Sequence, residues 1–366
     1  MTTTAPESHV VVEVRGRVGC ITLNRPRALN ALSLEMIRLI TQALKQWKDD
    51  AAVLAVVVRG VSKDAPFGAF CAGGDIRFFH QAALAGDDAL EAFFTEEYAL
   101  NHLVHTYPKP YIALMDGIVM GGGMGISQGA SLRIVTERSK LAMPETNIGL
   151  FPDVGGGYFL SRCAGRLGEF LALTGHVLTG REAITAGLAD GFIDSGRLPG
   201  LWNSLEQTPF ENGASVERWC ASHLNTTPAP APWPAKEVDR IFSLPDVLQI
   251  VAALDATDSD WARHTAATLR QRSPLMLHVV LEQIRRARGM GLADDLRMER
   301  DMVRRCFHLR PAAASETVEG IRALAVDKDH APRWNPARVE DVQPADVAAF
   351  FVSPWPSAAH PLRHLG

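Results

Sequence analysis

Paired cysteines, long apolar runs and charge of one dominant sign are all missing from this chain. Its five cysteines are scattered and never occur in C-x-x-C spacing, which argues against a disulfide framework and against a zinc site. The most hydrophobic run, Ala51–Val58, is far too short to span a bilayer. A net charge of −4 provides no general basic surface for nucleic acid. We therefore expect neither a membrane nor a nucleic acid as a partner.

Targeting signals and nucleotide-binding loops are also lacking. The first residues, MTTTAPESH, have neither the basic and apolar pattern of a signal peptide nor the arginine-rich character of a transit peptide. Together with the unpaired cysteines, this predicts a cytoplasmic protein. Neither glycine cluster of the chain fits G-x-G-x-x-G, and no Walker A lysine follows one, which argues against a dinucleotide or nucleoside phosphate site.

What the chain does contain is an alternation of strand and helix patterns through its first half. The predicted strands are Val10–Val14, Val18–Leu23, Val53–Val58 and Tyr111–Met115. Helices are predicted after Ser33, which can act as an N-cap, and over roughly Leu90–Thr106. The first two strands form a predicted hairpin, and the later rhythm predicts an α/β fold with parallel strands and crossover helices.

Residues 206–235 separate this part from a helical C-terminal region. Proline, alanine, asparagine and threonine dominate the segment, most clearly in Ala229–Ala235, so we predict a linker between a core at 1–205 and a helical region at 236–366. The predicted C-terminal helices are Lys236–Ala256, Ser259–Arg272, Leu275–Arg288 and Leu292–Leu309.

Two glycine clusters could present main-chain N–H groups to a ligand. The first, Ala72-Gly73-Gly74-Asp75, follows a predicted buried strand, and Asp75 can cap the next helix. The second, Gly121-Gly122-Gly123, stands where a helix should begin, so its unpaired N–H groups could stabilise an oxyanion. Simple turn formation explains the first cluster at least as well, and tight packing of a helix on a sheet explains the second.

Three acidic residues stand in unusually apolar surroundings. Glu145 follows Pro144 and lies between apolar flanks, which favours a catalytic carboxyl group over a solvated one. Asp153 precedes a likely helix start and could be only an N-cap. Glu97 shares a helical stripe with Phe93 and Leu100, so either a buried ion pair or a substrate contact would account for it.

The segment Gly125-Ile126-Ser127-Gln128-Gly129 matches the G-x-S-x-G nucleophile elbow of α/β hydrolases. That motif requires the serine at the turn between strand and helix. Ser127 instead falls well inside a predicted helix, so we interpret the match as chance.

Several segments together resemble the crotonase (enoyl-CoA hydratase/isomerase) superfamily. They are Leu23-Asn24-Arg25-Pro26 with Asn30-Ala31-Leu32, CAGGDI at 71–76, MGGG at 120–123, PET-x-IGLFPDVGGGYFL at 144–160, ALTG at 172–175, Ser273-Pro274 and VEGIRA at 318–323. The resemblance covers nearly the whole chain. Within the superfamily it is strongest to the branch that hydrolyses 3-hydroxyisobutyryl-CoA, a thioester of valine breakdown.

This resemblance implies a spiral of ββα units and an oxyanion hole made by the N–H groups of Ala72 and Gly122. Gly73, Gly74 and Asp75 would lie beside the bound acyl-CoA. Glu145 would be the nucleophile or the general base, with Asp153 assisting and Glu97 contacting the substrate. Candidates for binding the CoA phosphates are Arg25, Arg27, Lys63 and Arg77. Coenzyme A is part of the substrate, so no separate cofactor or metal is expected, and a homo-oligomer is possible.

Two other functions remain open from the sequence. An enoyl-CoA hydratase or isomerase is one, although similar hydratases carry a second glutamate where this chain has Gly125. An acyl-CoA-binding protein without activity is the other, and it would require the acidic residues to be dispensable.

Overall fold

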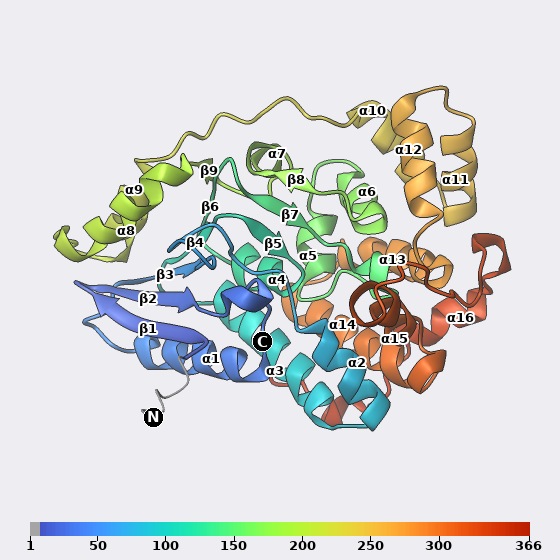
Figure 1. Ribbon diagram of the computed structural model, residues 1–366, viewed down its shortest axis with the longest axis horizontal. Coiled ribbons are helices and arrows are strands. Elements are labelled where there is room, and N and C mark those ends of the chain that lie inside the picture. Colours follow the sequence, from blue (N-terminus) through green and yellow to red (C-terminus); the bar gives the residue numbers. More distant parts are fainter. Residues whose placement is uncertain (1–7) are drawn as a thin grey trace. The chain divides into compact units, whose positions relative to one another are not determined.

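The computed structural model describes residues 8–366 and divides into two compact units (Figure 1). Within the described residues, unit 1 comprises 8–74, 103–141 and 178–229, and unit 2 comprises 75–102, 142–177 and 230–366. Each unit is therefore assembled from segments that are far apart in the sequence, a division that the expected boundaries near 205 and 236 do not follow.

Unit 1 is built on a six-stranded sheet in the order β1-β2-β3-β4-β6-β9. Its strands are β1 (Val10–Arg15), β2 (Val18–Leu23), β3 (Ala55–Gly60), β4 (Tyr111–Met115), β6 (Leu132–Val135) and β9 (Gly191–Phe192). β1 and β2 form the predicted antiparallel hairpin at one edge, and every later pairing is parallel. The valine-rich run of β3 is almost fully buried, as expected for a central parallel strand.

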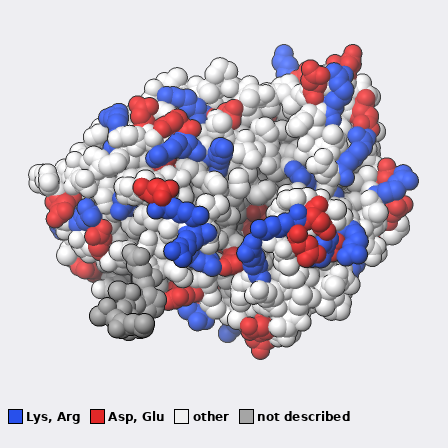
Figure 2. All heavy atoms as spheres, in the orientation of Figure 1, with Lys and Arg blue, Asp and Glu red and all other residues white. Residues whose placement is uncertain are grey.

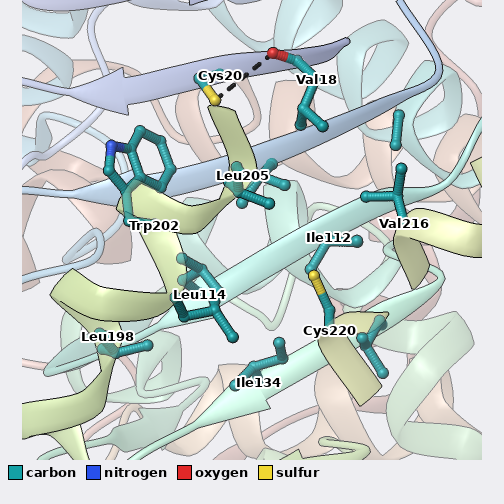
Figure 3. Close-up of a cluster of buried hydrophobic side chains, with 14 of the residues drawn as sticks. Val18, Cys20, Ile112, Leu114, Ile134, Leu198, Trp202, Leu205, Val216 and Cys220 are labelled. Atoms are coloured by element: carbon teal, nitrogen blue, oxygen red, sulfur yellow. Dashed lines mark hydrogen bonds between the residues drawn. The ribbon is translucent and has the colours of Figure 1, made fainter. Parts of the chain in front are cut away.

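Successive residues of β2 face opposite sides of this sheet. Val18 and Cys20 join a buried cluster with Trp202 and Leu205 of helix α8 (Leu198–Gln207), which is drawn in Figure 3. Gly19 faces the other side, where a Cβ atom would lie 2.6 Å from the Trp47 ring. Trp47 belongs to α1 (Leu34–Lys48), which begins at the predicted cap Ser33. Helices therefore cover both faces of the sheet.

The remaining elements of unit 1 include a small second sheet in the order β5-β7-β8. Its strands are β5 (Ile118–Met120), β7 (Lys140–Ala142) and β8 (Leu178–Thr179). The other helices of the unit are α4 (Gly122–Gln128), α7 (Gly180–Thr185) and α9 (Gly213–Ala221).

Unit 2 is mainly helical, as predicted for the C-terminal region. Its helices are α2 (Ile76–Ala85), most of α3 (Ala89–His105), α5 (Gly156–Ser161), α6 (Leu167–Thr174), α10 (Ala235–Phe242), α11 (Val247–Asp255), α12 (Asp260–Leu269), α13 (Pro274–Ala287), α14 (Leu292–His308), α15 (Glu316–Ile321) and α16 (Pro344–Ala348). The long α13 packs against α5 and α6.

Two sequence predictions are wrong in detail. The single helix predicted over Lys236–Ala256 is two helices, because Pro245 cannot continue a helix and Asp246 caps α11 by accepting from Gln249 N. The segment 206–235 is not all linker, because α9 lies within it and buries Val216 and Cys220 in the unit 1 core. Only the stretch after α9 runs as an extended trace in Figure 1.

The surface carries charges of both signs. Figure 2 shows lysine and arginine side chains interspersed with acidic ones on the face drawn. Across residues 8–366, no helix combines the length and the apolar character needed to cross a membrane. All five cysteines are buried, and none of them forms a disulfide bond.

Candidate active site

The two glycine clusters meet inside unit 1. Cys71 N donates to Ile118 O at 2.9 Å, and Met120 N donates to Cys71 O at 3.0 Å, so the first cluster runs beside β5 and the second continues from it. The approach is close enough that a Cβ atom at Gly123 would lie 2.3 Å from Cys71 O. Glycine is required there because no side chain fits.

Positive φ angles shape both turns. Gly73 has φ of +110° and Gly121 has φ of +46°, values that glycine adopts without steric cost. A Cβ atom at Gly73 would lie 3.8 Å from Gly122 N, so the two turns bring their main-chain groups together. The sequence prediction that separate glycine clusters converge is therefore consistent with the structure of unit 1.

The structure does not favour Ala72 as an oxyanion donor. Its N–H donates to Leu29 O at 3.0 Å and is already engaged. Gly74 N–H, by contrast, has no main-chain acceptor anywhere in residues 8–366. Gly122 is the first residue of α4, and an N–H at that position has no partner within its helix. Gly74 and Gly122 are thus the better pair. The prediction of Ala72 missed the loop of Leu29, which sequence spacing does not reveal.

Three of the predicted acidic residues gather in unit 2. Glu97 lies on α3, Glu145 begins the short 3-10 helix η2 (Glu145–Ile148), and Asp153 lies in the loop before α5. Their exposed fractions are only 2%, 7% and 5%. Asp153 accepts a hydrogen bond from the Tyr98 hydroxyl at 2.9 Å. Within residues 8–366, Glu97 Oε1 and Glu145 Oε2 have no hydrogen-bond partner.

Burial shifts the pKa values of these carboxyl groups upward. It raises the pKa of Asp153 to about 7, although the hydrogen bond from Tyr98 opposes the rise. The pKa values of Glu145 and Glu97 are raised well above their usual range, first by burial and then by the negative charge of Asp153. No basic side chain of unit 2 opposes these shifts. The ion pair that the sequence left open for Glu97 is therefore absent from the described residues.

A strained turn follows Asp153. Val154 has φ of +56°, which is unusual for a β-branched residue, and Gly155 has φ of +88°. Gly155, not Asp153, is the N-cap of α5, so the alternative that Asp153 is only a helix cap does not hold. Its side chain is left available for Tyr98 and for the neighbouring carboxyl groups.

Two fully buried acidic residues of α14 accept hydrogen bonds from the main chain of this turn and of α5. Glu299 accepts from Gly155 N at 2.7 Å and from Gly157 N at 2.9 Å, and Asp295 accepts from Tyr158 N at 2.9 Å. Burial raises the pKa of Asp295 to about 7 and that of Glu299 well above its usual range. Sequence reasoning missed both residues. Their spacing of four residues along the buried side of α14 was the available signal.

The structure also places the predicted helix cap, the serine of the G-x-S-x-G match and two of the cation candidates. Asp75 caps α2 by accepting from Phe78 N, which satisfies one of its oxygens. Ser127 lies inside α4 and donates to Gly123 O at 2.8 Å, which confirms that the G-x-S-x-G match is chance. Arg25 donates to Ala31 O, and Arg77 lines a surface hollow of about 790 Å³ in unit 2.

The remaining cation candidates, Arg27 and Lys63, are exposed in unit 1. No group of acidic, histidine or cysteine side chains within residues 8–366 could hold a metal ion.

Comparison with known proteins places these features in a family. The sequence pattern described as "Enoyl-CoA hydratase/isomerase" matches residues 18–351. A Danio rerio protein named "3-hydroxyisobutyryl-CoA hydrolase, mitochondrial" is 40% identical over 352 residues, covering 94% of this chain and 90% of its own. The chain belongs to the enoyl-CoA hydratase/isomerase family. A Homo sapiens member of the same name is 39% identical and covers 94% of this chain and 89% of its own.

Solved structures of family members confirm the predicted crotonase-like α/β fold with its helical C-terminal region. A carnitinyl-CoA dehydratase from Mycobacterium thermoresistibile superposes with a TM-score of 0.86 at 37% identity, covering 96% of this chain and 98% of its own. An enoyl-CoA hydratase from Rhodobacter sphaeroides 2.4.1 gives a TM-score of 0.82 at 37% identity, with 95% and 98% covered.

The prediction of a cytoplasmic protein is wrong by this comparison, because the Danio rerio and Homo sapiens relatives are named as mitochondrial. The prediction depended on the pattern of the first residues and on the lack of paired cysteine spacing. Cysteine spacing reports that thiols stay reduced, and it does not identify a compartment.

Proposed function

We propose that this protein is an acyl-CoA thioester hydrolase whose substrate is 3-hydroxyisobutyryl-CoA. One structural observation carries the proposal: Glu97, Glu145 and Asp153 are buried together with no basic partner. Burying three carboxyl groups is costly, and such clusters are typical of sites where protons are moved. The relatives of similar length and about 40% identity that are named 3-hydroxyisobutyryl-CoA hydrolase support the same activity.

Thioester hydrolysis develops negative charge on the carbonyl oxygen. In the proposed mechanism the N–H groups of Gly74 and Gly122 bind that oxygen, replacing the pair predicted from sequence. A single donor of this kind typically contributes about 3 to 4 kcal/mol to transition-state stabilisation. Gly73 supplies the positive φ of the turn that precedes Gly74.

Glu145 then acts in one of two ways. As a general base, its carboxylate takes a proton from water while the water oxygen attacks the carbonyl carbon and the C–S bond breaks. As a nucleophile, its oxygen forms a mixed anhydride that a second step hydrolyses. In both cases the departing thiolate needs a proton, which Asp153 can supply because its pKa is raised to about 7. The raised pKa of Glu145 favours the general-base role.

A hydratase is the second candidate, favoured by the names of the two superposed structures. Its chemistry would require a second carboxyl group from the helix that follows the glycine triplet. This chain has Gly125 at that place in α4, so the pair is incomplete. The hydrolase therefore fits the described residues better.

The test compares two activities, thioester hydrolysis and hydration of a double bond. Free thiol is measured during incubation with 3-hydroxyisobutyryl-CoA and 3-hydroxypropionyl-CoA, and loss of the enoyl double bond is measured with crotonyl-CoA. Thiol release without hydration supports the hydrolase, whereas hydration without thiol release supports the alternative.

A single turnover in ¹⁸O-labelled water then separates the two roles of Glu145. Label in its side chain indicates the anhydride, whereas label only in the product acid, with no capture of an acylated Glu145 by hydroxylamine, indicates the general base.

The proposal also includes side chains that bind the phosphate groups of CoA. Arg25, Arg27, Lys63 and Arg77 remain the candidates for the CoA phosphates, since phosphate groups prefer arginine and lysine partners.

A further inference from the structure

Asn101 on α3 is a buried amide that nothing in the protein satisfies. Its exposed fraction is 3%, and neither Oδ1 nor Nδ2 has a hydrogen-bond partner within residues 8–366. Buried amides in folded proteins nearly always have partners, because an unsatisfied one destabilises the fold. An amide without a partner in the protein takes one from outside it, either a buried water or a bound ligand.

The position of Asn101 on its helix connects it with the carboxyl groups. Residues three and four apart share one face of a helix, so Asn101 lies on the same face as Tyr98 and Glu97. Tyr98 donates to Asp153, and the charges of Asp153 and Glu145 act on Glu97. The face of α3 that carries Asn101 is thus the face turned toward the proposed catalytic carboxyl groups.

The unsatisfied atoms on this face define what could bind there. Glu97 Oε1 and Glu145 Oε2 are acceptors, or donors when protonated, and the Asn101 amide offers one acceptor and one donor group. An anion would be repelled by the carboxyl groups, and an aliphatic group would leave all of these atoms unpaired. A neutral hydroxyl group fits best, because it can accept from the Asn101 amide and donate its one proton to a carboxyl oxygen.

We propose that Asn101 is a specificity-determining residue that hydrogen-bonds the hydroxyl group on the acyl chain of the substrate. The inference rests on the proposed hydrolase function and extends it: the enzyme selects hydroxylated acyl thioesters over plain ones, and Asn101 makes part of that selection. A site built to bond a hydroxyl group strongly rejects the analogue that lacks it, because its own polar atoms are then left unpaired.

The test compares 3-hydroxyisobutyryl-CoA with isobutyryl-CoA, which differs only by the hydroxyl group. We expect the natural protein to prefer the hydroxylated thioester in kcat/KM. Asn101→Leu, which is close in size, should reduce that preference about 10- to 100-fold, mainly by lowering kcat/KM for the hydroxylated thioester. The control Leu100→Val disturbs the packing of the same helix and should leave the preference unchanged. An equal loss with both thioesters in Asn101→Leu would overturn the proposal and indicate a structural role.

Stability and binding give independent readouts. Because Asn101→Leu removes an unsatisfied amide, its Tm should rise by a few degrees, so loss of folding would not confuse the result. Dissociation constants for both thioesters are measured by calorimetry as well. If the natural protein released no thiol from either compound, the hydrolase proposal would fail, yet the ratio of dissociation constants would still test Asn101. An unchanged ratio in Asn101→Leu would reject its role.

Discussion

The two buried acidic residues of α14 should make the protein less stable as the pH rises. Burial raises the pKa of Asp295 from 3.8 to about 7, so the folded state holds a proton that the unfolded chain has already released. Between these two pH values the folded state binds more protons than the unfolded state. The free energy of unfolding therefore falls as pH increases through that window.

The size of the effect follows from the shift. Three pH units at 1.36 kcal/mol per unit correspond to about 4 kcal/mol, an upper limit because the charge of Asp295 also acts on buried Glu299 and the two groups titrate together. Asp295→Asn keeps an oxygen to accept from Tyr158 N and removes the ionisable group. We expect this variant to be more stable than the natural protein at pH 8, with a smaller advantage at pH 5.

Urea unfolding between pH 5 and pH 8 measures the difference at each pH. Asp294→Asn is the matched control, because Asp294 is the neighbouring residue on α14 and its side chain is 65% exposed. Its difference from the natural protein should not change with pH. If the Asp295→Asn difference were equally flat, the account of a buried Asp295 that keeps its proton in the folded state would be wrong.

Three other substitutions probe separate parts of the account. Tyr98→Phe removes the hydrogen bond that lowers the pKa of Asp153, so the limb of the pH profile of kcat/KM that reports Asp153 should move to higher pH; no movement would exclude Asp153 from the chemistry. Trp202→Ala empties a buried site beneath Arg59 in the unit 1 core and should cost about 3 to 5 kcal/mol of unfolding free energy in urea titrations, against less than about 1 kcal/mol for a surface change. Arg77→Ala should raise KM for acyl-CoA about 2- to 5-fold with kcat unchanged, and a constant KM would remove Arg77 from the phosphate site.

The sequence predicts much of the fold because local patterns and burial agree. The β1 and β2 hairpin, the cap at Ser33 and the strand Tyr111–Met115 all appear where expected, since alternation, capping and apolar runs are local signals. The helix α9 was missed because the proline- and alanine-rich composition around it hides a short helix. The break between α10 and α11 was missed although Pro245 signals it, because the apolar spacing continues on both sides of the proline.

The candidate site is only partly visible in the sequence. Glu145 and Asp153 stand out because they lie between apolar residues, where burying a carboxyl group is costly. Two of its features depend on segments that meet only in the folded chain. Ala72 N–H donates to Leu29 O, and Glu299 accepts from the turn that contains Val154. Asn101 gave no signal at all, because an asparagine becomes informative only when its burial and lack of partners are known.

The most direct test of the central claim is thiol release from 3-hydroxyisobutyryl-CoA by the natural protein and by Glu145→Gln. The substitution keeps the size of the side chain and removes its ability to accept a proton or attack a carbonyl group. We predict that the natural protein releases free CoA and that Glu145→Gln reduces kcat by about 10²- to 10⁴-fold while CoA binds with unchanged affinity. Unchanged turnover with intact CoA binding would contradict the account.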